Sequence, residues 1–324
     1  MTRSRGIGLV LLLLLAAVPL AGPGNYLLHL MVMALLWSYV YTSWSIMGRL
    51  GLVSFGHGAF LGIGAYGVVM LWNHWALSPW LGMPIAVLLS LAVAWVIGLP
   101  CFRFKIVGHY FALVTLALSE VARLIIVGLR DHTGGSLGLT PKSDLAAGAT
   151  MSLKAMQFAD KAVWFYIAMA AWLLALLVWR AVDRSMSRLA LEAISEEEDA
   201  AASIGIDVTR TKLRVTLLSA AMTCIGGVLI AQYQLYINPE TVSGISVSLQ
   251  MVFGAIAGGL FVMLGPTFGA VFLLVLSESL RVLIGNKVLG VDITIYGLLL
   301  VLFIIYMPKG ILGTVQARLV GPGR

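Results

Sequence analysis

Charged side chains are scarce in this sequence. Only 11% of its 324 residues are Asp, Glu, Lys or Arg, whereas about 25% is usual in a soluble domain. In contrast, 60% of the residues are hydrophobic and the mean hydropathy is +0.99. Because so few charges could not cover a water-facing surface, the composition predicts an all-α polytopic membrane protein.

The residue patterns of most catalytic and metal sites are also missing. The two cysteines, Cys101 and Cys224, provide neither a disulfide framework nor metal-ligand spacing, and we expect both to be packing residues. The sequence has no HExxH motif, no paired CxxC and no Ser-His-acid arrangement, and no lysine follows a glycine as a P-loop requires. We therefore expect no enzymatic activity and no metal site, and any ATP that drives this protein would be hydrolysed by another chain.

Apolar runs long enough to cross a bilayer fill most of the sequence. Allowing for breaks at Gly and Pro, we predict about ten transmembrane helices. They lie near residues 6–21, 26–47, 51–71, 80–100, 107–128, 163–179, 213–233, 246–263, 267–284 and 291–307.

The basic residues indicate orientation rather than nucleic-acid binding, although the net charge is +7. With the N-terminus inside, fourteen of the 21 Lys and Arg residues are cytoplasmic, five are outside and two lie within spans. This bias predicts that both termini are cytoplasmic. Arg3 and Arg5, followed by a leucine run and PLAG, also resemble a secretory signal peptide, whose removal would not alter the orientation of the other spans.

Residues 51–67, GLVSFGHGAFLGIGAYG, contain six glycines together with Ser54, His57 and Tyr66. A membrane protein tolerates such a stretch only inside a protein-lined core or pathway, so it favours a passage over an anchor. GxxxG spacings, which allow close helix packing, occur at Gly58 and Gly62, at Gly254 and Gly258, and at Gly265 and Gly269. Packing alone explains such spacings about as often as function does.

Polar residues within the spans are candidates for lining a path. They are Ser54, His57, Tyr110, Thr115 and Glu120. For His57 we favour a hydrogen bond to a neighbouring span, and a path-lining role is the second interpretation. Glu120 with Arg123, and Glu278 with Arg281, have the i, i+3 spacing of ion pairs. Each is either a structural pair or part of an outer vestibule for a zwitterionic solute.

Two hydrophilic stretches interrupt the spans. In the outer one, 129–162, the run RDHTGGSLGLTPKSD predicts a tight turn, which either meets a polar solute or is only a loop. In the inner one, 180–212, acidic residues precede the small residues Ala200, Ala201, Ala202 and Ser203, and Gly205 follows. This pattern predicts a short helix within 192–205 that fits a partner's groove; the alternative is a solvated loop.

An ordered set of segments carries a family resemblance. They are GLVSFGHGAFLGIGAYG, GHYFALVTLALSEVARL, TGGSLGL, EDAAASIGIDVTRTKLR, GGLFVMLGPTFGA and YGLLLVLFIIYMPKGILG. Together they resemble the permease subunits of branched-chain amino acid ABC importers, and more closely the second, longer permease of that heterodimeric pair. The resemblance extends from about residue 30 to residue 313.

The resemblance implies one permease domain over 1–324 with the type II importer fold, in a bacterial inner membrane. The implied partners are a second homologous permease, two ABC ATPases that bind ATP and Mg, a periplasmic solute-binding protein and membrane lipid, but no nucleic acid. The loop 180–212 would couple to the ATPase through Glu198, Ala200, Ala201 and Gly205, with one residue inserted after the acid. Where the family commonly has a basic residue and an amide just before this motif, this sequence has Ser195 and Glu197. Phe261 replaces a glycine that is common in the family, and we expect its ring to narrow or reshape a helix contact.

The expected cargo is a branched-chain amino acid or a related small polar solute. Urea and short amides are alternatives within the same family. A secondary transporter or channel without ATPases is a further alternative from a different class, and a non-transporting scaffold is the least favoured. Copurification of an ATPase and a second permease would distinguish these classes.

Overall fold

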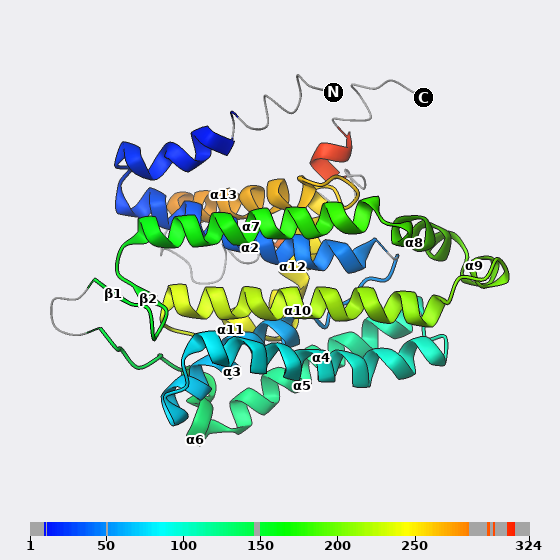
Figure 1. The fold of residues 1–324 in the computed structure, drawn as a ribbon, viewed down its shortest axis with the longest axis horizontal. Coiled ribbons are helices and arrows are strands. Elements are labelled where there is room, and N and C mark those ends of the chain that lie inside the picture. The colour runs from blue at the N-terminus through cyan, green and yellow to red at the C-terminus, as the bar shows by residue number, and fades with distance from the viewer. Residues whose placement is uncertain are drawn as a thin grey trace.

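In the part of the chain that the structure describes, the fold is a bundle of helices with two short strands. The computed structural model describes residues 10, 12–49, 51–145, 150–284, 297–298, 301 and 310–314. Its elements are η1 (Val18–Ala21), α2 (Asn25–Gly48), α3 (His57–Trp75), α4 (Pro79–Arg103), α5 (Gly108–Gly128), α6 (Arg130–Thr133), η2 (Gly135–Leu137), β1 (Met151–Ser152), β2 (Gln157–Phe158), α7 (Lys161–Arg184), α8 (Met186–Glu196), α9 (Glu198–Ser203), α10 (Val208–Gln234), α11 (Pro239–Val242), α12 (Gly244–Gly258) and α13 (Gly265–Ile284). The long helices run roughly along one direction (Figure 1).

Seven helices within the described residues are long and apolar enough to cross a membrane. They are Asn25–Gly48, Pro79–Arg103, Gly108–Gly128, Lys161–Arg184, Val208–Gln234, Pro239–Gly258 and Gly265–Val282. Each overlaps one predicted span, and the predicted all-α polytopic class is confirmed. The expected number of ten is approximate, since the predicted span 291–307 lies almost wholly outside the described residues, and 6–21 corresponds to the shorter helix Leu12–Ala21.

The glycine-rich span predicted over 51–71 begins later than expected. Residues 52–56 are not helical, and α3 starts at His57 and continues to Trp75. The apolar composition of 52–56 is typical of a transmembrane helix. Hydrogen bonds with Trp44 of α2 and Thr115 of α5 instead hold this stretch in a non-helical conformation. Non-helical backbone at membrane depth is tolerated where protein encloses it, and Leu52, Ser54 and Gly56 are buried.

The helices divide into a central and a peripheral group. In the most apolar window of each helix, 72% of α2, 67% of α10 and 61% of the α11–α12 segment is buried, against 22% of α5 and 28% of α13. Helix α10 packs against α3, α4 and α2, while α2 also contacts α7 and α13. The polar groups described below are therefore held mainly by α2, α3, α10 and α12.

The two hydrophilic stretches lie at opposite ends of the bundle (Figure 1). One end carries α6 and the two-residue strands β1 and β2, which pair antiparallel. Here a tight turn forms, in which Gly134 adopts a φ of +74° that favours glycine, and Gly135 N donates to Thr133 Oγ1 at 3.1 Å. The other end carries α8 and α9. The chain thus presents two distinct polar faces at the ends of its apolar bundle.

Candidate functional site

The first turn of α3 begins in a buried polar cluster. Phe55 N donates to Thr115 Oγ1 of α5 at 3.1 Å, and Gly56 N donates to Ser54 Oγ at 3.3 Å. Trp44 Nε1 of α2 donates to the carbonyl oxygen of Ser54 at 2.9 Å. These bonds satisfy backbone groups that the absent helical turn leaves free. The structure thus brings together two of the predicted path residues, Ser54 and Thr115.

His57 lies next to this cluster and is fully enclosed. Its Nε2 is 2.7 Å from Ser219 Oγ of α10, and Ser219 Oγ donates to the carbonyl oxygen of Ser43 on α2 at 2.6 Å. Because a hydroxyl has one hydrogen and a carbonyl cannot donate, Nε2 must be the donor to Ser219. The favoured interpretation, a hydrogen bond to a neighbouring span, is confirmed. A role in lining the path stays a prediction.

Serines on α5 and α12 extend the cluster. Ser248 Oγ accepts from Gly58 N at 2.9 Å and lies 3.0 Å from Ser119 Oγ. A Cβ added to Gly58 would be 2.7 Å from both serine oxygens, and one added to Gly62 would be 2.9 Å from Ser243 Oγ. Ser219 and Ser248 were not among the predicted path residues. A hydroxyl group within an apolar run indicates that the side chain takes part in buried hydrogen bonding.

Glycines bring backbones into direct contact between α12 and α13 and between α3 and α10. Between α12 and α13, a Cβ on Gly258 would overlap the carbonyl oxygen of Gly265, and one on Gly269 would overlap that of Gly254. Between α3 and α10, a Cβ on Gly227 would overlap the carbonyl oxygen of Leu61. The first contact involves four glycines of the predicted GxxxG pairs. The second was not predicted, although the doublet Gly226–Gly227 signals it.

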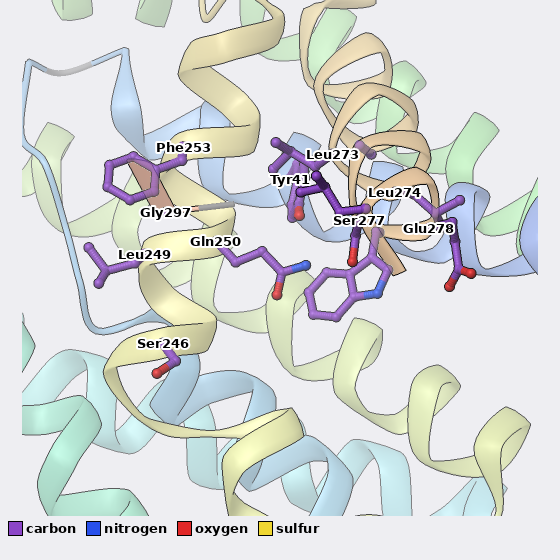
Figure 2. A pocket seen from close by; sticks show the side chains of 13 residues that line it. Tyr41, Ser246, Leu249, Gln250, Phe253, Leu273, Leu274, Ser277, Glu278 and Gly297 are labelled. Atoms are coloured by element: carbon purple, nitrogen blue, oxygen red, sulfur yellow. The ribbon is translucent and has the colours of Figure 1, made fainter. Parts of the chain in front are cut away.

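A cavity of about 490 Å³ lies between α2, α12 and α13 (Figure 2). Helices α12 and α13 are antiparallel and touch at their glycines near the turn that connects them. The cavity lies farther from this turn. Gln250 of α12 and Ser277 of α13 extend into the space between the helices (Figure 2). Its apolar lining includes Leu249, Phe253, Leu273 and Leu274, and its polar lining includes Gln250, Ser277 and Glu278. The cavity therefore offers both apolar and polar contacts to a small solute.

Both predicted ion pairs within spans are present. Arg123 pairs with Glu120 and also with Glu240, the latter at 3.0 Å. Arg281 Nη1 is 3.7 Å from Glu278 Oε1, and Tyr26 OH of α2 donates to Glu278 Oε2 at 2.9 Å. Glu278 thereby fixes one wall of the cavity to α2. Glu120 lies apart from the cavity, in the pair with Arg123.

Tyr110 lies apart from the other path candidates, and its role in the path stays a prediction. It stands in the first turn of α5 with 75% of its surface exposed, and therefore lies outside the buried cluster of Ser54, His57 and Thr115. Its neighbour Phe111 is the buried residue of this turn, packed against Phe102 with ring centroids 5.5 Å apart. The helical rotation between consecutive residues explains why one ring faces inward and the other outward.

The stretch 192–205 forms two helices rather than one. Helix α8 ends at Glu196, Glu197 is extended, and α9 comprises Glu198–Ser203. The carboxylate of Glu198 pairs with Lys212 of α10, and Asp199 Oδ1 is 2.7 Å from Lys105 Nζ. The two acids at the start of α9 therefore face the bundle.

The opposite side of α9 is open. Ala201 is buried, whereas Ala200, Ala202 and Ser203 are exposed, and Ile204 exposes 76% of its surface. Gly205 follows with a φ of +91°, a backbone conformation that ends the segment and favours glycine. Small exposed side chains leave space for a groove or ridge of another protein.

Phe261 does not reshape a helix contact, contrary to the expectation. It lies in the turn between α12 and α13 with 73% of its surface exposed. The contact is made instead by Gly258, Gly259 and Gly265, since a Cβ on Gly265 would overlap the carbonyl oxygen of Gly259. The turn directs the ring outward, where it borders a cavity of about 160 Å³ that Arg49 also lines.

Apolar spans, an enclosed polar cluster and a cavity between helices define a multi-pass membrane transport protein. Residues 26–307 match the family model described as branched-chain amino acid transport system / permease component. The chain belongs to this family. It is a permease subunit of an ABC importer, a transporter rather than an enzyme.

Several curated relatives are similar to this chain. The high-affinity branched-chain amino acid transport system permease protein LivM of Salmonella typhimurium is 29% identical over 292 residues, covering 85% of this chain and 67% of the relative. The LivM protein of Escherichia coli is 28% identical over 292 residues, with the same coverage. The probable branched-chain amino acid transport permease protein LivH of Methanocaldococcus jannaschii is 23% identical and covers 89% of both chains. No solved structure shows a significant match.

Proposed function

We propose that this permease carries branched-chain amino acids across a bacterial inner membrane, as half of a heteromeric permease pair. The observation that carries the proposal is the match of residues 26–307 to the permease component of branched-chain amino acid transport systems. The names LivM and LivH of the relatives support a pair of homologous permeases. The type II importer fold and cytoplasmic termini belong to the same proposal.

In this proposal two partner ATPases bind ATP and Mg and hydrolyse the ATP. Their contact surface is the exposed side of α9, formed by Ala200, Ala202, Ser203 and Ile204, with α8 beside it. These small side chains would let another protein approach closely, and the segment lies at one end of the bundle as a coupling element requires (Figure 1). A periplasmic solute-binding protein would deliver the solute at the opposite end.

The cavity between α2, α12 and α13 is the proposed place where the solute passes. Leu249, Phe253 and Leu273 offer contacts to an aliphatic side chain, while Gln250 and Glu278 offer polar partners for an amino acid's charged groups. Weak binding suits this role, because a solute must also leave. The binding protein would then supply most of the selectivity.

The test is ATPase activity of the gently solubilised complex with and without loaded binding proteins. Stimulation by a binding protein loaded with leucine, isoleucine or valine is expected. Stimulation only by one loaded with urea or a short amide would refute the proposed cargo. If neither an ATPase nor a second permease copurifies, a secondary transporter replaces the importer.

A pair of variants tests the route. Gln250→Leu removes a polar group from the cavity, whereas Gln234→Leu makes the same change at an exposed position on α10. In proteoliposomes with all partners, Gln250→Leu should reduce ATP-driven leucine uptake and Gln234→Leu should not. If both variants assemble into the complex equally well and take up leucine equally fast, the cavity is not part of the transport route.

A further inference from the structure

The two acidic residues that begin α9 are each held by a lysine from a different part of the bundle. Glu198 pairs with Lys212 in α10, and Asp199 pairs with Lys105 in the turn between α4 and α5. The chain positions of the lysines differ by more than a hundred residues, so the two pairs attach α9 to two separate elements. How strongly each pair holds α9 depends on how far water reaches it.

The two attachments differ in their surroundings. Lys212 exposes only 1% of its side chain and Glu198 27%, while Lys105 and Asp199 expose 73% and 75%. The Nζ of Lys212 is also 5.8 Å from the ring centre of Phe102 at the end of α4. A buried ammonium is tolerated only when it is paired, and an exposed pair contributes little. Glu198 is therefore committed to Lys212, and this bond is the firm attachment of α9.

Helix α10 connects this attachment to the buried cluster. Thr216 Oγ1 donates to the carbonyl oxygen of Lys212 at 2.9 Å. Further along the same helix, Ser219 bonds to His57 at the start of α3 and to Ser43 of α2. An uninterrupted helix transmits displacement along its axis because its backbone hydrogen bonds resist local change. A movement of Lys212 would therefore reach both α3 and α2.

We infer that Lys212 is the positioning residue that transmits movement of α9 to the transmembrane helices. The inference rests on the proposed function, in which α9 receives its movement from an ATPase. In this role Glu198 faces inward to Lys212, and the ATPase is met by the exposed small residues of α9. Lys105 restrains the same helix through its exposed pair with Asp199 without carrying the coupling.

The experiment compares leucine transported per ATP hydrolysed in proteoliposomes that hold the full complex. Lys212→Met is expected to lower this ratio about tenfold with ATP hydrolysis retained, a change within the usual range of coupling between sites. The matched control Lys105→Met, which breaks the exposed pair, should stay close to wild type. Lys212→Arg should restore most of the ratio because it keeps the charge. An unchanged ratio in Lys212→Met would overturn the inference.

A second measurement does not depend on a substitution at Lys212. Spin labels at Glu197→Cys, directly before α9, and at Arg210→Cys on α10, both exposed positions, report the distance between these helices during the ATP cycle. A constant distance while α9 moves against the ATPase is expected, and separation of α9 from α10 would overturn the inference. Failure of the wild-type complex to couple ATP to uptake would instead remove the proposed function.

Discussion

The contact between α3 and α10 leaves no room for a side chain at Gly227. A Cβ built there would be 2.9 Å from the carbonyl carbon of Leu61 and 3.1 Å from the amide nitrogen of Ala65, and it would overlap the Leu61 oxygen. All these atoms are backbone, so no side-chain rotation relieves the overlap. We therefore expect Gly227→Ala to push the two helices apart.

The size of the effect follows from two opposing terms. Alanine gains up to about 1 kcal/mol over glycine inside a helix. Against this, α3 must retreat by about an ångström to restore ordinary contact with the Leu61 oxygen, and overpacking of this kind costs about 1–3 kcal/mol, with the upper end expected where backbone must move. We expect Gly227→Ala to lower the free energy of unfolding by about 2 kcal/mol.

The assay is unfolding of the purified protein in mixed micelles with increasing SDS, followed by tryptophan fluorescence. Gly128→Ala is the matched control, because a Cβ at Gly128 in α5 meets no atom within 4 Å. This control should be neutral or more stable than wild type. If the two variants unfold at the same SDS fraction, the backbone contact between α3 and α10 is not as close as described here.

The remaining predictions concern the buried cluster and the attachment of α9. Ser219→Ala removes the partner of His57 Nε2, so the same assay should show a loss of about 1–3 kcal/mol. Thr223→Ala, which removes only a bond to the carbonyl oxygen of Ser219 in the same helix, should lose less, and the reverse order would contradict the network. The hydrogen bond and charge of Lys105 hold the pKa of Asp199 below its ordinary value. Their pair should therefore be complete above about pH 5 and be lost as the pH falls through that lowered pKa. Spin-label distances between α9 and the turn after α4 should stay constant from about pH 8 to pH 5 and lengthen only in stronger acid; lengthening already at pH 6 would refute this.

The transmembrane spans could be predicted because composition and length are enough to recognise an apolar run that can cross a bilayer. The start of α3 could not be predicted, because the apolar composition of LVSFG at 52–56 fits a helical and a non-helical backbone equally well. Its conformation depends on Thr115, which lies far away in sequence. The divided helix at Glu197 was missed for a similar reason, since acidic residues and alanines suit one continuous helix as well as two short ones.

The site was predictable in part. Spacing alone gave the i, i+3 pairs and the glycine pairs, because both depend on the geometry of one helix. Contacts between elements, such as Lys212 with Glu198 and Gly227 with Leu61, depend on which helices are neighbours. Tyr110 shows the same dependence, because the sequence alone does not tell which side of α5 is exposed.

The glycine contact between α12 and α13 gives this hairpin the geometry of a lever. Ser277 lies about 18 Å along α13 from Gly265, taking about 1.5 Å per residue. A rotation of about 5° around the touching backbones would move the far end of α13 by about 1.6 Å over that length. The glycines would hardly shift, while the polar wall of the cavity would move by roughly the radius of a water molecule. A few degrees at a point too crowded for a methyl group are thus enough to change what fits between these helices.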